Sequence, residues 1–312
     1  MILITGSDGY IGSSLIEFLN KKKFSVRGTN RRLKLKVDKD LDYVHVDLKK
    51  NKISKTIFKN VESIIHTVSL NHDDCIRNPQ LAKKINVDGT INLLKNASKM
   101  GVKQFIYLST IHVYGNNLCL NTSEEKKPNP NSIYAKTHYQ AEREIFKFCN
   151  GKNINPIILR ISNISGCPTN KNINCWGLVI NDLCKQSILK KKILLKTSGN
   201  QIRDFISLSD FNNIIYKIIR LKNKSISGVF NISRNKSVKI RTVAQMIKKI
   251  SYKKFKISIN VETNKYDTEN YKKYSINNRK IVSTLNIKKF KNLEYDIDKV
   301  LDFASNNFFF RK

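Results

Sequence analysis

Short apolar runs alternate with longer amphipathic segments through the first half of this chain. Apolar residues at three- and four-residue spacing predict helices, and short continuous apolar runs predict buried strands. The expected strands are 2–4, 24–29, 43–46, 63–69 and 104–108, and the expected helices include 13–19 and 79–101. Strands and helices that alternate at such lengths pair in parallel through right-handed crossovers. The pattern therefore predicts an α/β fold with a doubly wound parallel sheet.

The second half continues the alternation less regularly. It contains an expected strand at 155–161, helices at 175–189 and 211–221, a short strand at 229–232 that returns to the main sheet, and lysine-rich alternating segments from residue 241 onward. We expect residues 1–166, together with 204–232, to form the first domain. Residues 167–203 and 233–312 would then form a smaller C-terminal α/β lobe that closes over a substrate, because clefts between lobes are favoured ligand sites.

Glycines at positions 6, 9 and 12 follow the first strand directly and precede the first helix. Gly6 permits a tight turn, Gly9 lets the backbone approach a pyrophosphate, and Gly12 lets helix and strand pack closely. The N-terminus of the helix then offers its N–H groups to phosphate oxygens. Glycines at this spacing also occur in ordinary loops, but their place between a strand and a helix favours a dinucleotide-binding domain at residues 1–166.

The net charge is +34, from 58 lysines and arginines against 24 acidic residues. One interpretation is a polyanionic partner such as RNA, DNA or an anionic membrane. The other is a general preference for lysine, asparagine and isoleucine, as an AT-rich genome would produce. The basic residues are spread along the chain, without an arginine-rich tail or a basic repeat interleaved with aromatics. We favour the second interpretation, which makes a nucleic-acid partner the weaker alternative.

Cysteine spacing and the lengths of the apolar runs bear on the compartment. The six cysteines, at 75, 119, 149, 167, 175 and 184, form no Cys-x-x-Cys pair and have no histidine at zinc-ligand spacing. We therefore expect reduced thiols and no metal site. Because the chain begins on a core strand and its apolar runs are too short for a bilayer, we expect no signal peptide, no membrane span and a cytoplasmic protein.

Several further motifs accompany the glycine turn. They are Asp47-Leu48, Asn86-Val87-Asp88-Gly89-Thr90, Ser109-Thr110 with Val113-Tyr114-Gly115, Tyr134, Leu159-Arg160 with Asn163, and Arg203-Asp204-Phe205. With this set the chain resembles, over most of its length, the NAD-dependent epimerase/dehydratase family of extended short-chain dehydrogenases, of which UDP-glucose 4-epimerase is typical. The resemblance implies a Rossmann-like domain, a bound NAD or NADP, a nucleotide-diphosphate sugar as substrate and a homodimer.

The resemblance also implies a division of catalytic roles. Tyr134 is the general base that removes a proton from a sugar hydroxyl while hydride leaves the same carbon for the nicotinamide, and Thr110 hydrogen-bonds the same oxygen. The family places a lysine four residues after the tyrosine, but this chain has His138 there, one helical turn away on the same face. A free tyrosine has a pKa of ~10, so it needs nearby positive charge to act at neutral pH.

Two interpretations of His138 stay open. In the first, the site remains catalytic: the imidazole bonds the nicotinamide ribose and, if protonated, lowers the pKa of Tyr134, while the charge of the nicotinamide carries more of the activation. In the second, the site has decayed and binds without turnover, which leaves a dinucleotide-binding scaffold for RNA or another polyanion. The presence of Tyr134, Thr110 and the glycine turn favours the first.

The remaining site residues follow from the same resemblance. The cofactor contacts that it implies are Gly6, Gly9, Tyr10, Ile11, Gly12, Asn30, Arg31, Asp47, Leu48, Thr67, Val68, Ser69, Asn86, Ser109, Tyr134, His138 and Ser162, and the substrate contacts are Thr110, Asn163 and Arg203. At position 30 an NAD enzyme usually carries a carboxylate for the adenosine ribose. Asn30 followed by Arg31 does not repel a 2′-phosphate, which favours NADP over NAD.

The two residues after Thr110 bear on the type of reaction. In related 4,6-dehydratases both are acidic and perform the elimination of water, whereas here they are Ile111 and His112. We therefore favour a 4-epimerase or 4-reductase over a 4,6-dehydratase. His112 either faces the sugar or packs below it, and the sequence does not choose between these positions.

Overall fold

A computed structural model describes residues 1–30, 42–50, 53–221, 226–264, 266–267 and 271–308. The chain divides into two compact units, the first of residues 1–117, 124–161 and 212–231, and the second of residues 118–123, 162–211 and 232–312. This division differs from the predicted domains mainly at residues 204–211, which group with the second unit. The reason is that strand β9 (Ile202–Ser207) pairs there with β7 (Asn163–Ser165) and β11 (Ser237–Lys239).

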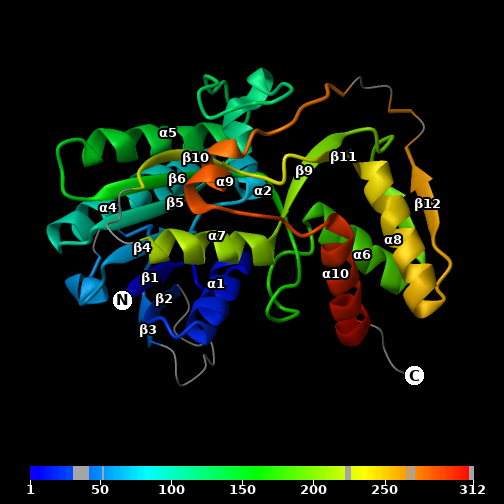
Figure 1. The fold of residues 1–312 in the computed structure, drawn as a ribbon, viewed down its shortest axis with the longest axis horizontal. Coiled ribbons are helices and arrows are strands. Elements are labelled where there is room, and N and C mark those ends of the chain that lie inside the picture. The colour runs from blue at the N-terminus through cyan, green and yellow to red at the C-terminus, as the bar shows by residue number, and fades with distance from the viewer. Residues whose placement is uncertain (31–41, 51–52, 222–225, 265, 268–270, 309–312) are drawn as a thin grey trace. The chain divides into compact units, whose positions relative to one another are not determined.

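The first unit is organised around a seven-stranded sheet (Figure 1). Its strands are β1 (Ile2–Thr5), β2 (Val26–Asn30), β3 (Asp42–His45), β4 (Ser63–His66), β5 (Gln104–Thr110), β6 (Asn155–Ile161) and β10 (Gly228–Ile232). They lie in the order β10-β6-β5-β4-β1-β2-β3, and the pairs from β3 through to β6 are parallel. The strand order reverses direction between β1 and β4, so the predicted doubly wound, Rossmann-like sheet is confirmed.

Helices cover both faces of this sheet. Helices α4 (Thr90–Lys99) and α5 (Ile133–Cys149) pack their apolar sides on one face, where Leu93, Ile145 and Phe105 belong to one buried cluster. Helix α1 (Tyr10–Lys21) lies on the opposite face beside α7 (Leu208–Arg220) (Figure 1). The ring centroids of Phe18 and Tyr216 are 6.3 Å apart where these two helices meet. Burial on both faces explains why the strands are apolar runs rather than alternating patterns.

The segment predicted as one helix over 79–101 is three consecutive helical pieces. Helix α3 (Pro79–Lys83) passes into a π-helical turn (Lys84–Gly89) and then into α4. A Cβ atom at Gly89 would lie 2.9 Å from the carbonyl oxygen of Leu48, so a loop after β3 approaches the helix at this point. A further helix, α2 (His72–Arg77), precedes it and begins at Asn71, whose side chain accepts a hydrogen bond from the Asp74 N–H. Single-turn π-helical insertions often occur at functional sites.

The second unit has its own core. Besides the three-stranded sheet β11-β9-β7, it contains β8 (Lys192–Leu195) paired with β12 (Asn260–Thr263), and helices α6 (Val179–Lys190), α8 (Ile240–Phe255), α9 (Arg279–Leu285) and α10 (Leu293–Phe308). Apolar residues of α6, α8 and α10 form its buried cluster. Helix α6 begins four residues later than predicted, because Cys175 to Leu178 form a turn in which the Leu178 N–H donates to the Cys175 carbonyl at 3.1 Å.

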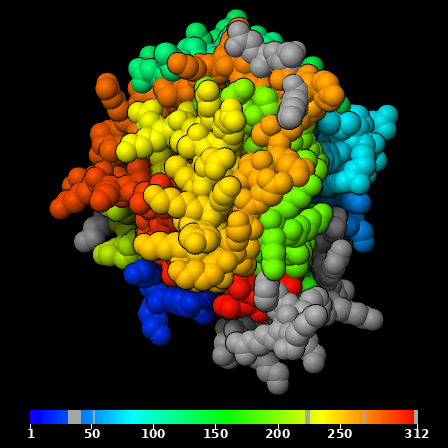
Figure 2. Space-filling view, turned by 90° about the vertical axis from the view of Figure 1, so that its right-hand side faces the viewer, coloured from blue at the N-terminus to red at the C-terminus, as the bar shows by residue number. Residues whose placement is uncertain are grey.

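Basic residues dominate parts of the surface of the second unit. Helix α8, yellow to gold in Figure 2, exposes Arg241, Lys248, Lys249 and Lys253. The same helix buries Ile240, Val243 and Ile247. Its charges thus belong to the solvated face of an ordinary amphipathic helix. Within the described ranges, no helix is both long enough and apolar enough to cross a membrane.

Candidate active site

The glycine turn after β1 excludes side chains. Gly6 has a φ of 67°, and a Cβ atom at Gly12 would lie 2.2 Å from the Gly6 carbonyl oxygen, inside the backbone itself. A Cβ at Gly9 would lie 3.2 Å from the same oxygen. Glycine is therefore required at Gly6 for its dihedral angle and at Gly12 for close packing. The turn is compact enough for a phosphate to approach the backbone.

Helix α1 begins at this turn in a way that suits an anion. Its N-cap is Gly9, which provides no side-chain hydrogen bond, and its fully described first turn contains no acidic residue. The positive end of the helix dipole therefore has no carboxylate of its own helix beside it. Together with the excluded side chains, this end fits the pyrophosphate of a dinucleotide.

The end of β4 lies against the turn. A Cβ on Gly6 would come within 2.9 Å of both the Thr67 Oγ1 and the Val68 Cγ2, so these two predicted contacts border the glycines. The Thr67 hydroxyl donates to the Thr5 carbonyl at 2.7 Å and thereby ties β4 to β1. Ser69 follows on the exposed side. The structure thus brings Thr67 and Val68 together with the turn.

Other predicted cofactor contacts are occupied in different ways. Asn30 ends β2 and is buried, whereas Arg31 lies outside the described residues. Asp47 accepts a hydrogen bond from the Lys49 N–H at 3.0 Å, and Leu48 is buried. These positions follow β2 and β3, the strands on the β1 side of the strand-order reversal.

Asn86 has a positioning role that differs from the predicted cofactor contact. Its side chain is fully buried within the π-helical turn. The amide oxygen accepts from the Leu70 N–H at 2.8 Å, and the amide nitrogen donates to the Thr137 Oγ1 at 3.1 Å. Asn86 therefore ties the loop after β4 to helix α5, and its amide groups are already used within the protein.

Helix α5 presents Tyr134 in its first turn. Ser132 caps the helix by accepting a hydrogen bond from the Ala135 N–H at 3.2 Å. The half-buried Tyr134 phenol is hydrogen-bonded to Thr110, which ends β5. Removal of the phenol from water raises the pKa of Tyr134 to about 12, although the Thr110 hydroxyl opposes that rise. The structure thus places the two predicted catalytic residues in contact.

His138 is neutral and deeply buried. Its Nδ1 lies 2.9 Å from the Tyr107 hydroxyl, and its ring centroid lies 4.5 Å from that of Tyr134. Burial lowers the pKa of His138 to about 3, and nearby His112 lowers it further. The imidazole is therefore uncharged at neutral pH and cannot supply the charge of the usual lysine. With the Tyr107 phenol donating to Nδ1, the ring proton lies on Nε2, which has no partner among the described residues.

Two exposed histidines also border the Tyr134 ring. The ring centroids of His72, in the first turn of α2, and of His112, just after β5, each lie 6.4 Å from that of Tyr134. Both imidazoles are exposed, so His112 faces outward beside the phenol rather than packing below it. The place of His72 was not foreseen, since only the fold brings α2 and α5 together.

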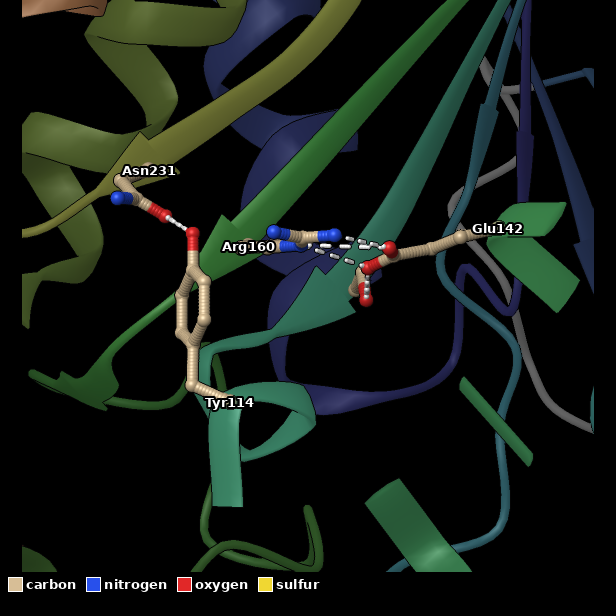
Figure 3. A network of polar contacts seen from close by, with 5 residues as sticks. Tyr114, Glu142, Arg160 and Asn231 are labelled. Atoms are coloured by element: carbon tan, nitrogen blue, oxygen red, sulfur yellow. Dashed lines mark hydrogen bonds and ion pairs between the residues drawn. The ribbon is translucent and has the colours of Figure 1, made fainter. Parts of the chain in front are cut away.

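A buried ion pair supports the floor of this region (Figure 3). The Arg160 guanidinium points from β6 toward the Glu142 carboxylate on α5, with Nη2 2.7 Å from Oε2. The Ser109 hydroxyl donates to the same carboxylate, so this predicted cofactor contact is used inside the protein. Arg160 also lies 4.8 Å over the Tyr114 ring, whose hydroxyl donates to Asn231 at 2.7 Å. The network links β5, β6, α5 and β10.

Three predicted site residues belong to the second unit. The Ser162 N–H donates to the Ile232 carbonyl at 2.9 Å, and Asn163 donates to the Asp204 carbonyl at 2.8 Å. Arg203 lies on β9, where it donates to its neighbouring carbonyl, Ile202, at 3.0 Å. The Asp204 carboxylate accepts from the backbone N–H groups of Arg234 and Lys236, and burial raises its pKa to about 6.

Comparisons with known proteins agree with this geometry. The profile of the NAD dependent epimerase/dehydratase family matches residues 2–233. UDP-glucose 4-epimerase of Vibrio cholerae is 25% identical over 257 residues, which cover 80% of this chain and 74% of that protein. UDP-glucuronic acid decarboxylase 6 of Arabidopsis thaliana is 27% identical over 259 residues, with 80% and 74% covered. UDP-glucuronic acid 4-epimerase from Bacillus cereus, solved with UDP-glucuronic acid and NAD, has a TM-score of 0.80 at 20% identity and covers 98% of this chain and 99% of that one.

The matched segment contains the glycine turn, Thr110, Tyr134 and His138. The similar proteins include both epimerases and a decarboxylase, and they give no support to the polyanion-binding alternative. The match extends over well more than half of the residues. The chain therefore belongs to the NAD dependent epimerase/dehydratase family.

Proposed function

We propose that this protein is an NAD(P)-dependent nucleotide-sugar epimerase or reductase that transfers hydride at a sugar carbon with the help of Tyr134. The observation that carries the proposal is the pairing of two features of the first unit. One is the glycine turn after β1, from which side chains are sterically excluded; the other is the Tyr134 phenol hydrogen-bonded to Thr110 after β5. Both lie at the carboxyl ends of parallel strands, where open α/β sheets bind ligands.

In this proposal the bound nicotinamide supplies a hydride acceptor. Thr110 and Tyr134 hold the hydroxyl oxygen on the carbon that loses hydride, and the phenol oxygen receives the hydroxyl proton. The Thr110 hydroxyl donates to the phenol oxygen and so favours its ionised form. The buried Nε2–H of His138 donates to the nicotinamide ribose, which gives this nitrogen the partner that the described residues do not provide.

The substrate class follows from the family and from two residues of the second unit. We assign Asn163 and Arg203 to the diphosphate of a nucleotide sugar, because a guanidinium offers planar, permanently charged donors. The similar Bacillus cereus enzyme binds UDP-glucuronic acid and NAD. Position 30 carries an uncharged asparagine, which favours NADP, and positions 111 and 112 carry no carboxylate, which favours epimerisation or reduction over dehydration. We expect a homodimer, as the family implies, and light scattering measures it.

The test is a comparison of two tyrosine variants of helix α5. Tyr134→Phe removes only the phenol oxygen, and Tyr139→Phe makes the same change five residues along the helix, on a different face. We expect Tyr134→Phe to lower kcat/KM with a nucleotide sugar by ~10²- to 10⁴-fold, as for the loss of a general base. Tyr139→Phe should retain the wild-type rate.

Thermal shift assays with NAD, NADP and a panel of nucleotide sugars show whether the Tyr134→Phe protein still binds its ligands. Retained binding with lost turnover supports the proposal. Wild-type turnover by Tyr134→Phe would overturn it, and so would a wild-type protein that binds neither a dinucleotide nor a nucleotide sugar.

A further inference from the structure

The phenol of Tyr134 is surrounded by imidazoles of different character. His138 lies beneath it, neutral and 1% exposed, whereas His72 and His112 stand at its exposed side. The titratable groups that face the phenol within the described chain are His72 and Cys75 from α2, Tyr107 from β5, His112 from the turn after β5, and His138 from α5. None of these is a lysine or an arginine, so the phenol has no permanent cation beside it in this set.

His112 is linked to the phenol more closely than His72. Its backbone N–H donates to the Thr110 Oγ1 at 3.2 Å, and Thr110 is hydrogen-bonded to Tyr134. Because Oγ1 already accepts from His112, its single proton is directed to the phenol oxygen. The chain of bonds fixes residue 112 relative to the reacting oxygen. His72 has the same ring separation from Tyr134 but belongs to α2, which is not part of this chain of bonds.

The phenol needs a proton acceptor near it. With a pKa of about 12, roughly one Tyr134 side chain in 10⁵ is ionised at pH 7. The buried His138 does not hold a proton at that pH, because its pKa is about 3. An imidazole in water has a pKa of about 6.5, so an exposed histidine exchanges protons readily at neutral pH.

We propose that His112 is the proton acceptor of the oxidation step, taking up the proton that leaves the substrate hydroxyl by way of Tyr134 and returning it in the reverse step. This inference rests on the proposed function. The substrate O–H bond breaks as its proton passes to the phenol oxygen, and the phenol proton passes to the imidazole of His112. The C–H bond of the same carbon breaks, and its hydride goes to the nicotinamide. The sugar is oxidised, the nicotinamide is reduced, and one proton remains on His112.

The first test follows reduction of the dinucleotide at 340 nm in a single turnover. We expect His112→Ala to slow reduction at pH 7 by ~10²-fold or more, and to remove the rise in rate that the wild type shows as pH increases through about 6.5. Because position 112 is exposed, added imidazole should restore much of the rate. His72→Ala is the matched control and should stay within about twofold of the wild type. Equal losses in the two variants, or no rescue by imidazole, would overturn the inference.

The second test needs no substrate, cofactor or turnover. Proton NMR of the five histidines, with His112 assigned from the His112→Ala spectrum, measures its titration in the unliganded protein. We expect a midpoint within about one pH unit of 6.5 that moves in Tyr134→Phe beyond the error of the fit. A His112 that stays neutral from pH 5 to 9, or whose midpoint ignores Tyr134→Phe, would overturn the inference. If the wild type reduces no dinucleotide with any nucleotide sugar, the proposed function fails while this titration still decides the role of His112.

Discussion

The buried ion pair between Arg160 and Glu142 offers a quantitative test of the first unit. The two side chains are 5% and 2% exposed, and their nearest atoms are 2.7 Å apart. Arg160→Met removes the guanidinium and leaves the Glu142 carboxylate buried with Ser109 as its remaining side-chain donor (Figure 3). Breaking a buried pair by removing one partner typically costs ~3–5 kcal/mol, because the other charge is left uncompensated.

A double-mutant cycle separates the pair from the rest of the network. We expect Arg160→Met and Glu142→Gln to lower the free energy of unfolding by ~3–5 kcal/mol each. The double variant should lose less than the sum of the two, with a coupling energy of roughly 1–3 kcal/mol. The exposed pair of Lys21 and Glu17, 71% and 51% exposed, is the control, with an expected coupling of about 0.5 kcal/mol or less.

The assay must report on the first unit. The single tryptophan, Trp176, belongs to the second unit, so its fluorescence is unsuitable here. Hydrogen exchange of the β5 and β6 amides in native conditions reads the free energy of opening of the strands that carry Ser109 and Arg160. Single variants that cost less than ~1 kcal/mol and add without coupling would refute the claim that this pair stabilises the floor of the site.

Two further predictions concern the glycine turn and the second unit. Gly12→Ala should strongly weaken dinucleotide binding measured by calorimetry, because its Cβ would lie 2.2 Å from the Gly6 carbonyl oxygen, whereas Gly177→Ala, with nothing within 4 Å, should bind normally; unchanged binding by Gly12→Ala would contradict the steric argument. Burial raises the pKa of Asp296 from 3.8 to about 7, so its contribution to stability is complete below pH 3.8 and is lost as pH rises through 7, by ~4 kcal/mol in all. Asp296→Asn should flatten this decline in denaturant titrations followed by Trp176 fluorescence between pH 4 and 8; a decline as steep as that of the wild type would refute the assignment.

The sheet of the first unit was predictable because its signals are local. The apolar run of β1, the glycines after it and the strand at 155–161 occur where the sequence places them. The break of the 79–101 helix was not predictable, since the π-helical turn depends on how closely the loop at Leu48 approaches Gly89. The start of α6 was wrong because residues 175–178 fit the helical period yet form a turn.

The candidate site was predictable in part for similar reasons. The contact of Thr110 with Tyr134 joins residues whose positions follow from strand and helix ends. The protonation state of His138 depends on burial, which spacing along a helix does not reveal. Asn86 and Ser109 match motif positions, but the partners of their side chains are set by distant residues, Thr137 and Glu142. Tertiary packing thus decides which motif residues remain open to a ligand.

The most direct measurement of the central claim is deuterium transfer in a single turnover. A nucleotide sugar deuterated at the carbon that is oxidised is mixed with the protein and NAD or NADP, and mass spectrometry then locates the label. The account predicts deuterium on the nicotinamide with the wild type, and a transfer ~10²-fold or more slower with Tyr134→Phe. Deuterium that is lost to water, that stays on the sugar, or that moves equally fast in both proteins would contradict hydride transfer assisted by Tyr134.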